Sequence, residues 1–553
     1  MSNSKKRAMN KRILYIYSLV VAVLYSCSSD KPDNFEPRLL TLSASDISRT
    51  EATLHGKCFT DKGVVKPKLW FRFGNDATSM NVKQDATAEH DDSVSLHLSG
   101  LTAGTTYYYM LQGSNGTASL SGEMLNFTTA PNHRPTVGKV EILSSGPMSV
   151  IVGYGIVDNG GDPVTLNGCR IYCTESNGDN EIRTFVQSEG TDKNGLYRLR
   201  IDGLSPNTSY CLTPYATNKN GEAEGEELRF TTSSAVVLGE PGFLSTLIGE
   251  DKYKYSSITL AGPLNGDDLR TLRMMAGRDI NGNATEGILA DIDIAGASIV
   301  AGGGEYGESR VTEEGVLGTG LFRSCQNLKH ISLPMTAVKI EKDAFADCSS
   351  LRSLSVPASV VEITPSAGCT SLESIDVSPA NVSYSCSDGV LMSIDGKKIL
   401  WFPMGKKGEF VLPATVESLG NYAFRDCSIE KIVLPEGLTQ LGQCIFYDSK
   451  VKEVVLPNAM EQLPTGTFQN CNHLKIVRIG AKMKLLSEYA FDGCQLSDLY
   501  VSANMPPVCY KTTFSTSGID FTKTCRLHVP KGRKAYYRAD LQWKVFQNII
   551  DDL

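Results

Sequence analysis

The sequence contains few of the residues and motifs on which most enzymes depend. It has only three tryptophans and seven histidines among 553 residues, and no histidine belongs to a His-Glu-x-x-His zinc motif. Fifteen cysteines are present, yet no Cys-x-x-Cys pair occurs, so neither zinc nor thioredoxin-like chemistry is indicated. A Gly-x-Ser-x-Gly nucleophile elbow is also lacking. We therefore expect no enzyme activity, no metal site and no cofactor.

A positive charge excess and a long apolar run are lacking as well. Lys and Arg total 54 against 61 Asp and Glu, a formal charge of −7. This balance argues against a nucleic-acid partner, because such proteins usually carry a basic domain or stripe. The run from Ile13 to Tyr25, interrupted only by Ser18, is shorter than the roughly twenty apolar residues that a membrane-spanning helix needs. The length allows three or four domains.

The N-terminus has the layout of a secretion signal. Five Lys and Arg residues precede the apolar run, which closes on Leu24-Tyr25-Ser26-Cys27. This ending resembles the lipobox of bacterial lipoproteins, and the resemblance implies cleavage before Cys27 and lipid attachment to it. We expect a signal peptide over 1–26, a tether over 27–37, and an outer-membrane, lipid-anchored protein that faces the cell exterior. An uncleaved anchor or a cleaved peptide without lipid remains the alternative.

Two modules of about 100 residues follow. Gly100–Tyr107 matches Gly203–Tyr210, and Phe127 matches Phe230, both at an offset of 103 residues. The size and the alternation of apolar residues predict immunoglobulin-like sandwiches over 38–130 and 131–234. The Leu-x-Pro/Ala-x-Thr-x-Tyr pattern resembles the tyrosine corner of fibronectin type III domains, which implies a tyrosine hydroxyl bonded to nearby backbone. The core tryptophan common in that family is lacking. Such modules are expected to act as spacers.

A shorter period begins at about residue 320 and continues to 505. Prolines recur at intervals of 22 or 23 residues, and a Phe-x-x-Cys block recurs in phase with them. The blocks begin at Phe322, Phe345, Phe424, Phe468 and Phe491. Together with Leu-x-x-Leu-x-Leu runs, this pattern resembles the BspA-like (Treponema-type) leucine-rich repeats. Such repeats bury their faces only against one another, so we predict a solenoid whose Phe and Cys side chains line up inside.

The repeat pattern is irregular in places. Ser366 stands where a Phe is expected, and Ser449 where a Cys is expected. Between Pro379 and Pro413 the spacing grows, and Asp395-Gly396 separates two apolar runs, which predicts a protruding hairpin at about 384–403. We expect an N-terminal cap over 235–319, with a helix at 267–275, and a C-terminal cap over 506–553 that buries Trp543.

Other motifs favour structural roles. The repeat cysteines are expected to form a buried apolar column, and Cys509 with Cys525 is the one pair we consider for a disulfide. Gly302–Gly307 has a Gly-x-Gly-x-x-Gly spacing, but no helix pattern follows it, so a loop is expected.

The outward-facing strand positions of the later repeats are the candidate binding face. They place Val433, Val455, Arg478 and Tyr500 in one column, with Ile476 in the adjacent column. Apolar residues among charges are typical of a protein-binding patch, although ordinary exposed strand residues would look the same. Trp401, on the predicted hairpin, is expected to be exposed and would suit a sugar.

The sequence thus predicts a mainly β, multidomain surface protein that displays a solenoid. Resemblance to BspA-like proteins implies adhesion to host or cell-surface proteins. The alternative is a glycan-binding accessory lipoprotein of a polysaccharide-uptake system, whose partner would be a polysaccharide. A scaffolding role without a ligand is a third possibility.

Overall fold

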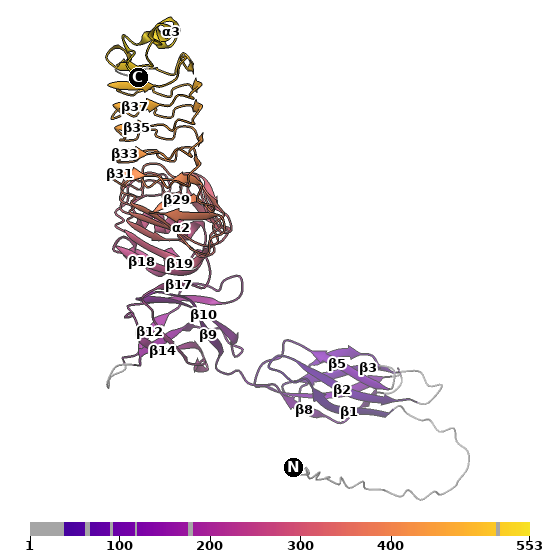
Figure 1. Ribbon diagram of the computed structural model, residues 1–553. Helices are drawn as coiled ribbons and strands as arrows, with labels where there is room; N and C mark the ends of the chain where they lie inside the picture. Colours follow the sequence, from indigo (N-terminus) through magenta and orange to yellow (C-terminus); the bar gives the residue numbers. More distant parts are fainter. Residues whose placement is uncertain are drawn as a thin grey trace, which may run out of the picture. The chain divides into compact units, whose positions relative to one another are not determined.

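The computed structural model describes residues 38–60, 67–88, 92–114, 116, 119–174, 181–515 and 520–553. The expected signal peptide, the tether and Cys27 lie outside the described residues. The chain divides into two compact units, 1–132 and 133–553 (Figure 1). No helix in the described part is both long and apolar enough to cross a membrane.

The first unit consists of two antiparallel sheets around one core. One sheet has the order β1-β2-β5, and the other has the order β4-β3-β6-β7 with β8 also paired to β6. Leu54, Phe71 and Tyr109 of the two sheets are fully buried in a common cluster. The strands are β1 (Arg38–Ser45), β2 (Ala52–Phe59), β3 (Lys68–Gly74), β4 (Val82–Ala86), β5 (Ser93–Leu98), β6 (Thr106–Ser114), β7 (Ser119–Ser121) and β8 (Leu125–Thr128).

The second module, at the start of the second unit, has the same plan. Its strands are β9 (Thr136–Ser145), β10 (Ser149–Asp158), β11 (Leu166–Cys173), β12 (Arg183–Val186), β13 (Tyr197–Asp202), β14 (Ser209–Asn218), β15 (Gly221–Glu224) and β16 (Leu228–Thr231). The predicted tyrosine hydrogen bond occurs in both modules. Tyr107 accepts one from the backbone N–H of Thr102, and Tyr210 accepts one from that of Ser205, each at 2.9 Å. The two segments that match at an offset of 103 residues therefore have the same local structure.

The second module is joined to the solenoid by a continuous sheet. Strand β17 (Val236–Leu238) pairs antiparallel with β9 and parallel with β18 (Ser257–Leu264). The nine-stranded sheet has the order β13-β10-β9-β17-β18 and continues with β19 (Asp291–Ile299), β23 (His330–Ser332), β25 (Ser353–Val356) and β27 (Ser374–Val377). The boundary that we expected at 234/235 thus lies inside one sheet and one compact unit.

The region before the repeats contains the predicted helix. Helix α2 (Gly266–Met275) begins at Asn265, whose side chain accepts from the N–H groups of Asp267 and Asp268. The expected loop at Gly302–Gly307 is wrong: these residues form β20, which pairs with β21. The other elements here are α1 (Leu244–Ile248), η1 (Gly249–Tyr253), β19 (Asp291–Ile299), β21 (Arg310–Thr312) and β22 (Val316–Leu317).

Each repeat contributes one strand to one of two main parallel sheets, β23 to β27 or β31 to β39, and in most cases a two-residue strand on the return side. The main strands are β23 (His330–Ser332), β25 (Ser353–Val356), β27 (Ser374–Val377), β31 (Gly408–Val411), β33 (Ile429–Val433), β35 (Glu453–Val455), β37 (Ile476–Ile479) and β39 (Asp498–Val501). The return strands are β24 (Lys339–Ile340), β26 (Glu362–Ile363), β32 (Ser418–Leu419), β34 (Gln440–Leu441), β36 (Gln462–Leu463), β38 (Leu485–Leu486) and β40 (Val508–Cys509).

The Phe-x-x-Cys blocks form two stacked columns inside the solenoid. Phe424, Phe446 and Phe468 are fully buried, and their ring centroids lie 5.3 and 5.4 Å apart. The thiols of Cys348, Cys369, Cys471 and Cys494 each donate to the backbone carbonyl of the phenylalanine in the preceding turn, as in Cys471 Sγ to Phe446 O at 2.8 Å. Cys509 and Cys525, the pair considered for a disulfide, are both free thiols.

The residue before each repeat cysteine has a positive φ angle, which limits the residue types found there. Asp347, Asp426 and Asn470 have φ angles of 58°, 57° and 62°, in the left-handed region. Asp and Asn tolerate this conformation better than most residues, and Gly adopts it freely. Gly368 and Gly493 occupy the same position in their repeats. Ser324, before Cys325, has a φ of 61° at the same position, so the turn favours Asp, Asn or Gly there without requiring one of them.

The insertion at 384–403 does not protrude, so this expectation is wrong. Strands β28 (Tyr384–Ser387), β29 (Val390–Ser393) and β30 (Lys398–Trp401) form a meander, and β30 continues into the return sheet through β32. Alternate residues of β29 face opposite cores. Val390 and Met392 belong to the core of the later repeats, and Leu391 to that of the earlier repeats. The meander is therefore a buried partition between two halves of the solenoid.

The C-terminal segment closes the later core. It contains η2 (Phe521–Lys523), β41 (Arg526–His528), α3 (Lys534–Ala539), η3 (Trp543–Val545) and β42 (Asn548–Ile550). Trp543 is fully buried, as expected, and its Nε1 donates to the carbonyl of Pro507 at 2.8 Å. Its ring contacts Phe514, the last ring of the phenylalanine column, in an edge-on arrangement.

Candidate binding face

The register of the later main sheet aligns the predicted outward residues. Val433, Val455, Arg478 and Tyr500 are successive partners across β33, β35, β37 and β39. Val411 of β31 precedes them in the same column. We call these five residues the outer column. Ile476 lies in the neighbouring column, next to Glu453 and Asp498.

The valine half of the outer column is open to solvent. Val411 is 62% exposed, Val455 47% and Val433 39%. Ile476 and Arg478 are half-buried. Alternate residues such as Val454 are fully buried, because neighbouring side chains of a strand point to opposite faces. Three exposed β-branched side chains in line form an apolar stripe.

Tyr500 is held between two side chains and does not offer a free ring face. The Arg478 guanidinium lies 4.0 Å from the centroid of the Tyr500 ring. The His528 ring stacks on it with a centroid distance of 4.2 Å and an interplanar angle of 10°. Because β37 and β41 flank β39 on opposite sides, these neighbours cover both faces of the ring. Only the edge and hydroxyl of Tyr500 can meet a partner.

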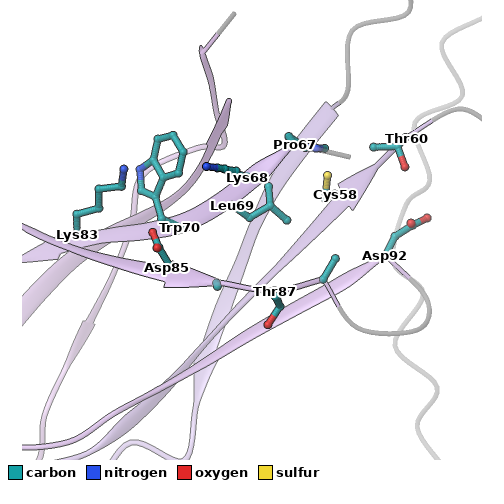
Figure 2. Close-up of a pocket in the computed structure, with 12 residues that line it drawn as sticks. Cys58, Thr60, Pro67, Lys68, Leu69, Trp70, Lys83, Asp85, Thr87 and Asp92 are labelled. Atoms are coloured by element: carbon teal, nitrogen blue, oxygen red, sulfur yellow. The ribbon is translucent and has the colours of Figure 1, made fainter. Parts of the chain in front are cut away.

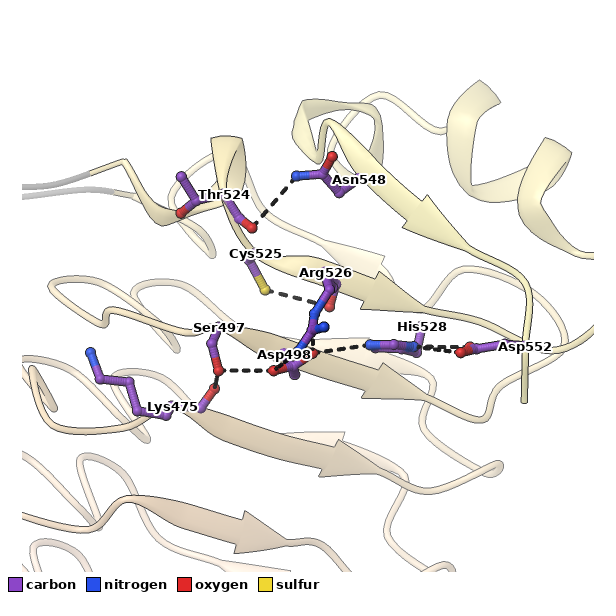
Figure 3. A network of polar contacts seen from close by, with 9 residues as sticks. All are labelled: Lys475, Ser497, Asp498, Thr524, Cys525, Arg526, His528, Asn548 and Asp552. Carbon is purple, nitrogen blue, oxygen red and sulfur yellow. Dashed lines mark hydrogen bonds and ion pairs between the residues drawn. The ribbon is translucent and has the colours of Figure 1, made fainter.

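A network of charged residues joins His528 to Asp498, Arg526 and Asp552 (Figure 3). Asp498 accepts from Arg526 Nε at 2.7 Å and lies 3.1 Å from His528 Nε2, while Asp552 lies 2.9 Å from His528 Nδ1. The hydrogen bond from Arg526, together with those from His528 and Ser497, lowers the pKa of Asp498 to about 2. Sequence patterns alone did not single out His528. Aligning Leu527-His528-Val529 with the repeat period would have placed it beside Tyr500.

Replacement of Asp498 by Asn is expected to lower the free energy of unfolding by about 2 kcal/mol at neutral pH. Since its pKa in the folded chain lies below the ordinary value of 3.8, this contribution is complete above about pH 4 and is lost as the pH falls towards about 2. The measurement is the free energy of unfolding against pH for both chains, with exposed Asp376→Asn as the control. Parallel curves for the wild type and Asp498→Asn would contradict the assignment.

Trp401 does not belong to this face. Its side chain is 1% exposed, so the expectation of an exposed tryptophan is wrong. The reason is that β30 lies in the buried meander, between β29 and β32, and Trp401 packs with the core of the earlier repeats.

A separate hollow lies in the first unit (Figure 2). Its volume is about 600 Å³, and its lining includes Cys58, Leu69, Trp70 and Lys83. The Lys83 ammonium lies 3.8 Å from the centre of the Trp70 ring, and Trp70 Nε1 donates to Gln112 at 3.1 Å. Lys83 and the Trp70 Nε1 group are thus already engaged within the unit.

Comparisons with known proteins identify the repeats. The chain is 22% identical to the pneumococcal vaccine antigen PcpA, covering 54% of this chain and 79% of that structure with a TM-score of 0.40. A leucine-rich cell surface protein from Faecalibacterium prausnitzii is 19% identical, with 54% and 77% covered and a TM-score of 0.35. A leucine-rich repeat protein from Eubacterium ventriosum is 17% identical, with 42% and 84% covered and a TM-score of 0.24. No curated protein matches the chain. The family described as BspA type leucine-rich repeat region matches residues 315–388 and 404–519 in six copies, so the C-terminal half of this chain contains BspA-type leucine-rich repeats.

Proposed function

We propose that this chain is a non-enzymatic surface lipoprotein whose later repeats bind a protein. The lipid is attached at Cys27 and holds the chain on the outer membrane, facing the cell exterior. The two N-terminal modules are fibronectin type III-like spacers, which the pair of tyrosine hydrogen bonds supports. The solenoid provides adhesion to a host or cell-surface protein.

The observation that carries this proposal is the apolar stripe of Val411, Val433 and Val455 in the outer column. Exposed aliphatic side chains in line gain free energy by contacting apolar side chains of a partner. Charged neighbours such as Glu453 and Arg478, which lie 3.6 Å apart, provide a polar rim. A protein surface supplies both kinds of contact.

The alternative, a glycan-binding accessory lipoprotein, finds less support on this face. Sugar sites usually present an aromatic ring face on which a sugar can stack. Trp401 is buried, and both faces of Tyr500 are covered by Arg478 and His528.

We expect Val455→Glu to weaken binding of a protein ligand by about tenfold or more, because a buried carboxylate without a partner is costly. The measurement is a binding array of host matrix proteins and polysaccharides against the full chain. The matched control is Val361→Glu, since Val361 is 58% exposed but precedes β26 in a different sheet. Binding only to polysaccharides, or equal loss in both variants, would contradict the proposal.

A further inference from the structure

The phenylalanine column is broken at one repeat. Ser366 occupies the position of Phe345 in the preceding repeat, and the stacked series resumes only at Phe402 and Phe424, which lie 4.7 Å apart. The backbone ladder of the return segments changes at the same place. The backbone N–H of Asp347 donates to the backbone carbonyl of Ala367 at 2.9 Å, as in a regular repeat. The equivalent N–H of the next turn, on Gly368, instead points to the Asp426 carboxylate at 3.4 Å.

A cavity of about 330 Å³ fills this break. Its size lies at the lower end of the range for small-molecule sites. One wall comes from the repeat that lacks Phe, and the other from the segment after the buried meander. Its lining includes Lys342, Ser366, Trp401, Met404, Tyr422 and Arg425.

Two N–H donors of the lining have no acceptor. Trp401 is 1% exposed, and its Nε1 makes no hydrogen bond within the described part of the chain. Arg425 Nε is also buried without a hydrogen bond, although it lies 3.4 Å from the Asp426 carboxylate. A buried donor without a partner costs about 1–3 kcal/mol, and native structures rarely leave one. We therefore expect that a ligand bound in the cavity supplies the missing hydrogen-bond acceptor for these two N–H groups.

The charges of the lining favour an anion. Lys342 makes no ion pair with any described residue and supplies the unbalanced positive charge, whereas Arg425 is paired with the Asp426 carboxylate. The one acidic lining residue, Asp343, is already engaged by Arg323 at 2.7 Å. Tyr422 is 43% exposed, and the Arg425 guanidinium lies 5.5 Å from the centre of its ring; the rest of the Tyr422 ring and the apolar side chain of Met404 provide surfaces for a flat or ring-shaped body.

We propose that this cavity binds a small ring-bearing carboxylate. The carboxylate accepts hydrogen bonds from Trp401 and Arg425 and is neutralised by Lys342, and the ring packs against Tyr422 and Met404. The ring belongs either to an acidic sugar or to an aromatic acid, and the two sources share the same recognition. This site is separate from the outer column and does not depend on its function.

Calorimetric titration of the full chain distinguishes the two sources. The probes are glucuronate with glucose as its neutral counterpart, and benzoate with benzyl alcohol. We expect at least one acid to bind about tenfold or more tightly than its neutral counterpart. No heat with either acid up to about 10 mM, as from a cavity that holds water only, overturns the proposal. Equal affinity for acid and neutral counterpart does the same.

Variants locate the binding. Ser366→Phe restores the repeat pattern and fills the cavity, so binding is expected to disappear. Lys342→Ala, on an exposed side chain, is expected to weaken binding about tenfold without affecting folding. Tyr422→Ala is compared with Tyr489→Ala, which occupies the same place in a regular repeat with a φ of 57° against 58°. Only the Tyr422 variant should lose affinity. Unchanged affinity in Ser366→Phe, in Lys342→Ala or in Tyr422→Ala overturns the assignment.

Discussion

Replacement of Phe446 by Ala will lower the free energy of unfolding by about 3–5 kcal/mol. Phe446 is fully buried at the middle of the column, between Phe424 and Phe468. Its removal deletes two ring contacts and leaves a cavity that two neighbouring repeats share. Because each repeat is stabilised chiefly by its neighbours, the loss cannot be confined to one turn.

Denaturant unfolding of the full chain provides the measurement. Phe446→Leu should cost less, since it retains most of the buried volume. Val433→Ala, on the exposed outer column, should change the free energy of unfolding by no more than about 0.5 kcal/mol. A loss below about 1 kcal/mol in Phe446→Ala would show that the column does not stabilise the solenoid.

Replacement of Gly262 by Ala will disrupt the junction between the second module and the solenoid. Gly262 has a φ of 93°, and a Cβ at this position would lie 1.9 Å from the backbone carbonyl oxygen of Leu238. Leu238 belongs to β17, the strand that joins β9 to β18. The clash with fixed backbone and the strained φ together should cost more than about 3 kcal/mol.

Hydrogen exchange of the amides in β9, β17 and β18 reports this disruption. We expect these amides to exchange much faster in Gly262→Ala, while the amides of the late repeats stay protected. Gly296→Ala is the matched control on β19, since its added Cβ would meet Ala261 Cβ at an ordinary 3.4 Å. Unchanged protection of β17 in Gly262→Ala would contradict a continuous sheet.

Short-range periodicity predicted the repeats well because it reports the solenoid directly. A 22- or 23-residue period of Phe and Cys implies that each turn repeats the conformation of the last, and the columns of Phe446 and Cys471 follow. The 103-residue offset worked for the same reason, through the bonds of Tyr107 and Tyr210.

The insertion was harder to predict because its position depends on what covers it. Asp395-Gly396 does mark a turn between β29 and β30, but a turn does not say whether the strands protrude. Val390, Leu391 and Met392 are consecutive and apolar, a pattern typical of a strand buried on both faces. A β29 strand buried on both faces implies that the whole meander, with Trp401 on β30, lies inside the solenoid.

The junction at β17 was missed for a similar reason. A strand of three residues, Val236–Leu238, has too little pattern to show which strands it joins. The outer column was accessible to sequence reasoning, because alternation fixes which side chains point outward. The stacking of Tyr500 between Arg478 and His528 required the register of the last strands.

We propose above that the later repeats bind a protein through the outer column. Hydroxyl-radical footprinting of the full chain with and without its bound protein ligand tests this claim most directly. We expect oxidation of Val411, Val433 and Val455 to fall in the complex, while that of Val361, exposed just before β26, is unchanged. Unchanged oxidation of the three valines, with protection elsewhere, would contradict it.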